Sequence, residues 1–303
     1  SLAMWNVAQN VWYGLSLGSV LLLAAIGLAI TFGVMGVINM AHGEMVMVGA
    51  YVAVMTQIWL GWSLYAALPI AFIITALLGL LIERCVVRKL YGRLGDTLLA
   101  TWGVAILVQQ FVRLEGGLSF FGMHIQGLGP GLQNMPVPAE LQGAISLGGT
   151  SINAYRAFIV LSTLLLTTAT WWVLYRTRVG MQVRAIIRNP RMAAACGIDV
   201  QRINAWTFAF GAGLAGVTGV LVAGFKTVSP DMGTSLVVDS FLVVVAGGVG
   251  SLLGAVATAI GLGEINGVLA ALSNDIVARA AMFGLVILLI VIRPQGLFSF
   301  KGR

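Results

Sequence analysis

Four ionisable residues lie within or at the ends of strongly apolar stretches of this chain: His42, Glu44, Asp239 and Glu264. Inside lipid, an ionisable side chain costs several kcal/mol unless it faces a water-filled cavity or a partner group. Each of the four is therefore a candidate for the wall of a hydrated path through a membrane. The plainer alternative for His42 and Glu44 is a satisfied polar contact near the cytosolic interface.

Neutral polar residues and glycines extend this set of candidates. Gln109 and Gln110 offer the uncharged donors and acceptors that a small polar solute requires, although glutamines also join neighbouring helices by hydrogen bonds. Asp239 precedes Gly247 and Gly248 in one apolar stretch, where glycines permit a close helix approach or a backbone break that exposes carbonyl groups. We expect Asp239 at the outer mouth of the path.

These residues do not form a recognisable catalytic or metal centre. His42 and Glu44 are two positions apart, about 200° around a helix, so they do not converge on one metal ion. The only other histidine is His124. The glycine-rich stretch 211–219 follows no strand, so helix packing explains it better than phosphate binding. We therefore predict no catalytic residue, no metal and no cofactor bound by this chain.

Composition identifies the elements that must hold these residues. Of the 303 residues, 59% are hydrophobic and 9% are charged, whereas soluble domains carry about 25% charged residues. Apolar runs of about 20 residues predict membrane-spanning helices and not a barrel. We expect one all-α polytopic domain, 1–303, with eight or nine spans. The approximate runs are 11–33, 37–58, 66–82, 97–112, 158–175, 203–223, 236–249, a run ending near 272, and 278–292.

Basic residues indicate how this bundle is oriented. Segments 84–93, 176–202 and 293–303 hold 13 of the 17 lysines and arginines. By the positive-inside rule, these segments are cytosolic. The order of the spans then predicts an N-terminus outside, a C-terminus in the cytosol, and an extracytoplasmic loop at 116–155, which is rich in glycine and proline. Whether 236–249 crosses the membrane or re-enters is open at this point.

Segment 176–202 carries six of the arginines. Asn189 suits the N-cap of a short helix, Pro190 its first position, and Gly197 its end. Arg184 and Arg188 lie four residues apart and would share one helix face. The segment is either a loop whose charges fix the topology or a docking element for a partner protein.

Five blocks of sequence carry a resemblance to a known family. They are GLAITFGVMGVINMAHGEMVMVGAYVA (27–53), LLATWGVAILVQQFVR (98–113), the stretch from RVGMQVRAIIRNP to GVTGVL (178–221), VDSFLVVVAGGVGSLLGAVATAIGLGEIN (238–266) and RPQGLFSFKGR (293–303). Together they resemble the permease subunits of bacterial ABC importers of the branched-chain amino acid type. Within that family, the tryptophan of LLATWG, the QQ pair, the GLGEIN block and the RPQGLF ending are most similar to the urea-transport branch.

The resemblance implies partners and a place in the cell. We expect a multi-pass subunit of the bacterial inner membrane, paired with a second homologous permease and two cytosolic ATPase subunits that use ATP. A periplasmic solute-binding protein would be received by the 116–155 loop, and 185–197 would dock into the ATPase. The candidate coupling residues are Arg184, Ala185, Arg188, Asn189, Pro190, Ala194 and Gly197.

Several functions are weighed against one another. The first is a non-enzymatic permease subunit that forms the path for a small polar solute, with urea preferred and a branched-chain amino acid as the alternative. The second is a stand-alone secondary transporter or channel, in which Glu44, Asp239 or Glu264 would be a proton or ion site. An intramembrane enzyme is disfavoured, because no nucleophile or metal set surrounds His42.

Overall fold

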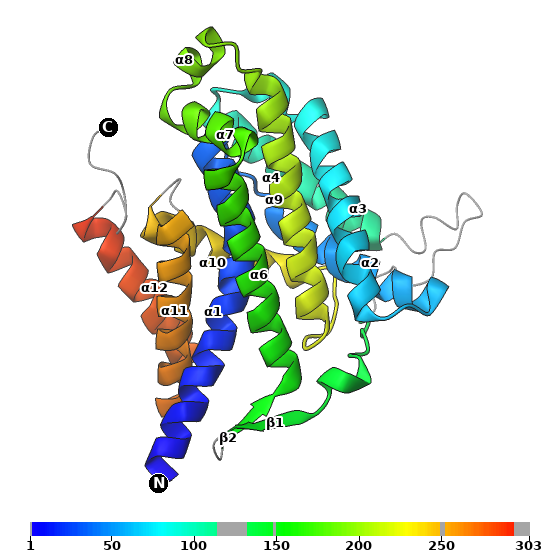
Figure 1. The fold of residues 1–303 in the computed structure, drawn as a ribbon, viewed down its shortest axis with the longest axis vertical. Coiled ribbons are helices and arrows are strands. Elements are labelled where there is room, and N and C mark those ends of the chain that lie inside the picture. Colours follow the sequence, from blue (N-terminus) through cyan, green and yellow to red (C-terminus); the bar gives the residue numbers. More distant parts are fainter. Residues whose placement is uncertain (1, 114–131, 148–149, 249–251, 294–303) are drawn as a thin grey trace.

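The computed structural model describes residues 2–113, 132–147, 150–248 and 252–293, and it consists mainly of long helices (Figure 1). Residues 116–131, including His124, and the RPQGLF block from 294 onward lie outside this described part. The elements in chain order are α1 Leu2–Met35, α2 His42–Leu60, α3 Leu64–Cys85, the 3-10 helix η1 Val87–Leu90, α4 Leu94–Arg113, the 3-10 helix η3 Ala139–Leu141, β1 Ala144–Leu147, β2 Thr150–Asn153, α6 Ala154–Arg176, α7 Arg178–Arg188, α8 Pro190–Ala195, α9 Val200–Ala223, α10 Met232–Gly247, α11 Leu252–Leu272 and α12 Asp275–Ile292.

Seven of the described helices are long and apolar enough to cross a membrane: α1 from Ala8 onward, α2, α3, α6, α9, α11 and α12. The helical membrane fold is therefore confirmed. Two further helices, α4 with 20 residues and α10 with 16, accompany them. The predicted total of eight or nine spans counts one or both of these helices, and it stays a prediction.

The helical pattern has one exception among the described residues. Strands β1 and β2 pair antiparallel, with Ala144 opposite Asn153, and form a hairpin within the predicted extracytoplasmic loop. The all-α prediction is wrong for these residues. In Figure 1 the hairpin and the N-terminal end of α1 lie at one end of the bundle, and α7 and α8 lie at the other. We call these the hairpin end and the α7–α8 end.

Helix α9 is the most buried of the seven candidate spans. Glycines let other helices approach it closely: a Cβ atom at Gly211 would lie 2.9 Å from the carbonyl oxygen of Gly27 on α1, and one at Gly213 would lie 2.7 Å from the ring of Phe72 on α3. Helix α11 packs against α1 in a similar way through Gly18 and Gly263. The glycine-rich stretch 211–219 thus serves helix packing, as predicted from the sequence.

Two helices begin after a non-helical break: α2 starts at buried His42, and α10 starts at buried Met232 beside the exposed Asp231. The sequence predicted a span starting near Val37, but residues 36–41 are not helical and α2 starts at His42. Gly36 has a positive φ of 64°, which glycine adopts without strain, and it turns the chain out of α1. Likewise, 224–231 is non-helical, and α10 covers Met232–Gly247, four residues earlier than the predicted run began.

The starts of α2 and α10 cross each other at two glycines. A Cβ atom on Gly43 would collide with the carbonyl oxygen of Gly233, and a Cβ atom on Gly233 would collide with that of Gly43. Non-helical backbone at membrane depth is tolerated where it is covered by protein or lines a water-filled cavity. The crossing therefore sets two chain breaks side by side, and we call it the α2–α10 junction.

Candidate functional site

The predicted docking segment forms two short helices. Asn189 caps α8 as expected: its side-chain oxygen accepts a hydrogen bond from the backbone N–H of Met192 at 3.1 Å, and Pro190 is the first helical residue. Gly197 ends this turn with a φ of +92°. Helix α7 was not predicted as a separate helix, and Thr177 caps it by accepting from the N–H of Gly180 at 3.1 Å.

Most of the candidate coupling residues lie on the exposed face of these helices, away from the bundle. Val183, Ile186 and Ala193 are buried against the bundle and anchor the pair. The guanidinium carbon of Arg184 lies 5.3 Å from the ring centre of Tyr175 on α6. Ala185 is half-buried, and the exposed members of the predicted set are Arg184, Arg188, Asn189, Pro190, Ala194 and Gly197. A partner protein can therefore reach most of this set without any rearrangement of the bundle.

A cavity of about 610 Å³ lies beside these helices, between α6, α7 and α9. Most of its lining is apolar, and Gln182, Asp199 and Arg202 supply polar groups. Empty space next to a short helix leaves room for it to move, because well-packed interiors resist such displacement. Helix α7 therefore borders unfilled space on one side.

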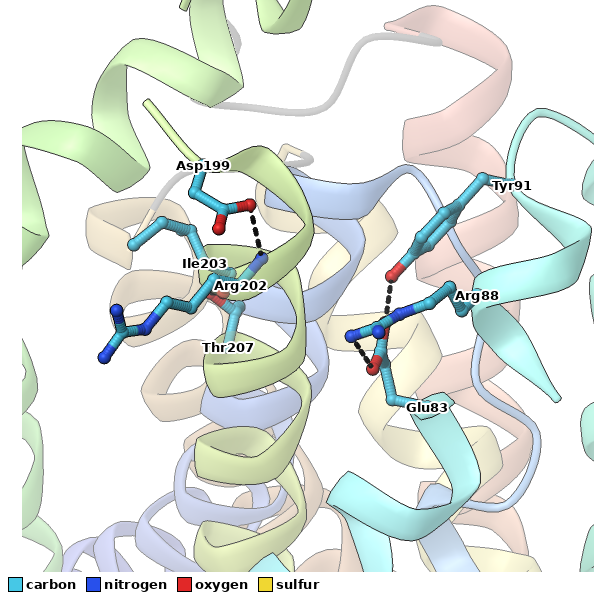
Figure 2. Close-up of polar contacts among 7 residues, drawn as sticks. All are labelled: Glu83, Arg88, Tyr91, Asp199, Arg202, Ile203 and Thr207. Atoms are coloured by element: carbon cyan, nitrogen blue, oxygen red, sulfur yellow. Dashed lines mark hydrogen bonds and ion pairs between the residues drawn. The ribbon is translucent and has the colours of Figure 1, made fainter. Parts of the chain in front are cut away.

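A buried polar cluster lies where α9 enters the bundle (Figure 2). The Glu83 carboxylate is fully buried at the end of α3; it accepts a hydrogen bond from the Tyr91 hydroxyl at 2.6 Å and pairs with Arg88 at 3.2 Å. Burial and the hydrogen bond to Glu83 raise the pKa of Tyr91. The Tyr91 side chain packs on a buried apolar group that contains Phe208 of α9, and Asn204, one turn earlier on α9, is buried. The cluster connects α3 and η1 to the first turns of α9.

The second candidate region is the α2–α10 junction. The ring of His42 is buried, and its Nε2 lies 2.7 Å from the carbonyl oxygen of Ala24, to which it donates. Glu44 is 6% exposed, and its buried Oε2 has no hydrogen-bond partner among the described residues. The same holds for the buried hydroxyl of Tyr51. Seven residues separate Glu44 and Tyr51, so the two side chains lie on one face of α2.

Polar groups from two other elements converge on this face. The Gln109 amide on α4 donates to Asp231, which precedes α10, at 2.8 Å, and Arg113 forms an ion pair with the same carboxylate oxygen. Asp231 comes two residues before Gly233, where an added Cβ atom would lie 3.3 Å from the backbone nitrogen of Glu44. Glu44 and Tyr51 on α2 therefore lie beside Gln109, Arg113 and Asp231. We call these five residues the junction cluster.

The remaining predicted path residues lie elsewhere. Asp239 sits within α10 and pairs with Arg279 of α12 at 3.0 Å, beside a cavity of about 170 Å³ that Lys226 also lines. Gln110 is exposed, and Glu264 on α11 lies against Gly14 of α1. Gly247 ends α10 close to Gly254, and Gly248 follows it with a φ of +98°. Of the predicted set, Gln109 bonds to Asp231 just before α10, and Glu44 lies at the start of α2, which contacts the start of α10 at Gly233. Asp239 and Glu264 make their contacts elsewhere.

Sequence reasoning missed three members of the junction cluster: Tyr51, Arg113 and Asp231. Two signals were present. Gln109 and Arg113 are four residues apart and share one face of a helix. Asp231 follows Pro230, a residue that often precedes a helix start. Within the described residues, no group of three or more His, Cys, Asp or Glu side chains could hold a metal ion.

Residues 10–292 match the family described as the permease component of branched-chain amino acid transport systems. The chain belongs to this family. It is similar to the high-affinity branched-chain amino acid transport system permease protein LivH of Escherichia coli, with 30% identity over 96% of this chain and 95% of the relative. It is also similar to BraD of Pseudomonas aeruginosa, with 29% identity over 98% and 97%, and to LivM of Escherichia coli, with 26% over 93% and 68%.

Membership of this permease family agrees with the geometry. The matched residues run from α1 to the end of α12, so the α7–α8 end and the junction cluster both lie inside the family's shared region. The relatives are transport permeases and not enzymes. Together with seven apolar helices, this makes the chain a multi-pass membrane permease.

Proposed function

We propose that this chain is one permease subunit of an ATP-driven importer in the bacterial inner membrane, and that it forms part of the path for a small polar solute. The observation that carries the proposal is the exposed, capped pair α7–α8, which leads directly into the buried helix α9. The sequence contains no phosphate-binding glycine loop, so the energy of ATP must arrive through contacts with another protein. Short capped helices can pass a rigid-body movement to the bundle.

The proposed complex has further subunits. LivH and LivM of Escherichia coli are both similar to this chain, which supports a pair of homologous permeases. Two cytosolic ATPase subunits would bind the α7–α8 end, and a periplasmic solute-binding protein would bind the hairpin end. This arrangement sets the N-terminal end of α1 outside, as the distribution of basic residues predicts.

Branched-chain amino acids are the first candidate solutes. The relatives that cover almost the whole chain are named for that class of solute. Urea is the second candidate, because the LLATWG, QQ, GLGEIN and RPQGLF motifs resemble the urea-transport branch. Both solutes are small and carry N–H donors and an oxygen acceptor, which suits a path lined by a few polar side chains.

Reconstitution tests the proposal. The chain is purified with the subunits that accompany it, inserted into proteoliposomes, and supplied with its solute-binding protein and ATP. We expect uptake of labelled leucine or labelled urea that requires ATP. Co-purification of two ATPase subunits and a second permease supports the assignment. ATP-independent uptake by the purified chain alone would overturn it in favour of a secondary transporter or channel.

A further inference from the structure

The start of α2 lies beside the middle of the candidate span Ala8–Met35 of α1. Its depth follows from the contact of His42 with Ala24, since Ala24 is 11 residues before Met35 in the candidate span Ala8–Met35. A rise of about 1.5 Å per residue puts that contact roughly 16 Å from the Met35 end of α1. The hydrocarbon core is about 30 Å thick, so the start of α2 is close to half depth.

Part of the cluster is open to the surroundings at this depth. The Asp231 side chain is 70% exposed and that of Arg113 is 35% exposed. Charged groups at membrane depth face a partner or a water-filled cavity and not lipid. The face formed by the starts of α2 and α10 and the end of α4 is therefore turned toward water or toward a partner subunit, and the cluster passes from exposed Asp231 to buried Glu44.

The inner end of this cluster holds two acceptors without partners. Oε2 of Glu44 and the hydroxyl of Tyr51 are both buried and make no hydrogen bond with any described residue. A buried carboxylate without a partner costs several kcal/mol, and proteins retain such a group where something else binds it. The glycine crossing at Gly43 and Gly233 fixes the position of Glu44, because the two backbones are in contact there.

We propose that the junction cluster is a solute-binding site halfway along the path, and that the Glu44 carboxylate accepts the N–H groups of the transported solute. This inference rests on the proposed permease function. The chemistry required of the solute is an N–H donor, which both the ammonium of an amino acid and the amide groups of urea provide. Arg113 and the Tyr51 hydroxyl are the donors within the cluster for the solute's oxygen, and Gln109 holds Asp231 in place.

The test is Glu44→Gln in the reconstituted complex, with Tyr51→Phe as a second variant. Glu44→Gln keeps the shape of the side chain and removes the charge that the N–H groups would meet. Hydrogen bonds to charged groups contribute about 1.5–3 kcal/mol, so we expect the solute concentration at half-maximal uptake to rise about 10- to 100-fold. Because Oε2 has no partner among the described residues, the thermal midpoint should stay unchanged or rise.

The matched control is Asp96→Asn, which removes an exposed carboxylate at the opposite end of α4, where it pairs with Arg93 at 3.6 Å. Its uptake should equal that of the wild type. Wild-type uptake in Glu44→Gln would overturn the proposal. A lower thermal midpoint together with lost uptake would also overturn it, because Glu44 would then be a structural residue.

The same experiment separates the two solute sources. Labelled leucine and labelled urea are supplied in parallel, and the solute that the wild-type complex takes up identifies the N–H group involved. If the wild type takes up neither solute with ATP, the proposed function fails. If the wild type takes up one solute and Glu44→Gln transports it equally well, only the binding-site inference fails.

Discussion

The helices at the α7–α8 end and those at the α2–α10 junction begin in opposite ways. At the α7–α8 end, Thr177, Asn189 and Asp199 each cap a helix by accepting a backbone N–H. At the junction, α2 and α10 start without any side-chain cap. The first group is exposed or half-buried, whereas the second is in backbone contact at Gly43 and Gly233, with His42 buried and Asp231 exposed.

This difference reflects two origins of structure, contacts between neighbouring residues and contacts between distant segments. A capped surface helix takes its shape from neighbouring residues, and each cap contributes about 1 kcal/mol. The junction takes its shape from contacts between distant segments: Arg113 and Asp231 are 118 residues apart in sequence. We therefore expect changes at the α7–α8 end to affect coupling with little loss of folding, and changes at the junction to affect both packing and the path.

The largest expected effect is at the α7–α8 end. Arg188→Glu, or replacement of both Asn189 and Pro190 by glycine, should abolish solute-stimulated ATP hydrolysis and leave membrane insertion intact. The first change reverses an exposed charge, and the second removes the cap and the rigid first residue of α8. Hydrolysis is measured on the reconstituted complex, with insertion checked by membrane fractionation.

Arg93→Glu is the control for this prediction. Arg93 is an exposed basic residue outside α7 and α8, and its ion pair with Asp96 is of the surface type that contributes about 0–1 kcal/mol. Stimulated hydrolysis should persist in this variant. If the solute still stimulates ATP hydrolysis normally in both variants, α7 and α8 do not couple the ATPase to the permease.

The second prediction concerns the junction. Gly43→Ala places a methyl group against the carbonyl oxygen of Gly233 and must push α2 and α10 apart. Overpacking of this kind costs about 1–3 kcal/mol, so we expect a lower thermal midpoint and strongly reduced uptake. The control is Gly261→Ala on α11, where no atom lies within 4 Å of the added Cβ. That change should keep uptake and the midpoint within error or raise the midpoint, because alanine favours helix over glycine.

The two regions also show what the sequence could predict. The hydrophobic runs located most of the long helices to within about five residues, because a span of about 20 apolar residues is a local property. Helix α1 is the exception, since it begins at Leu2 and the predicted run began at residue 11. The cap at Asn189 and the end at Gly197 were predicted for the same reason. The break at 36–41 was missed, because no proline marks it and the stretch is as apolar as the helices around it.

Site residues were predictable only where a local rule applied. Glu44 and Gln109 were chosen because they are polar residues within apolar runs, and the structure places Glu44 at the α2–α10 junction and bonds Gln109 to Asp231 beside it. Asp239 met the same rule, but its partner Arg279 lies 40 residues later, and no local pattern indicates that pairing. Asp231 ends the turn 224–231, and the backbone pairing of Val228 with Gln133 holds this turn in place. The sequence alone does not specify that long-range contact.

The smallest expected effect is at the buried cluster of Glu83, Arg88 and Tyr91, which lies between the two regions and is built from residues close in sequence. Tyr91→Phe removes the hydroxyl that donates to Glu83 at 2.6 Å and leaves the buried carboxylate paired with Arg88, as Figure 2 shows. The free energy of unfolding should fall by about 1–3 kcal/mol. This is measured as a lower thermal midpoint of the purified complex. Because α7 and α8 stay unchanged, stimulated hydrolysis at low temperature should match the wild type.

Tyr175→Phe is the control for that change, since the ring under Arg184 is retained and the side chain is exposed. Its thermal midpoint should change little, because a surface substitution changes the free energy of unfolding by about 0.5 kcal/mol or less. If Tyr91→Phe instead abolishes stimulated hydrolysis without lowering the midpoint, movement reaches the bundle through Tyr91 and Asn204. The coupling path would then extend from α8 along the first turns of α9 to the end of α3, and the division between a locally built surface and a packed interior would no longer hold.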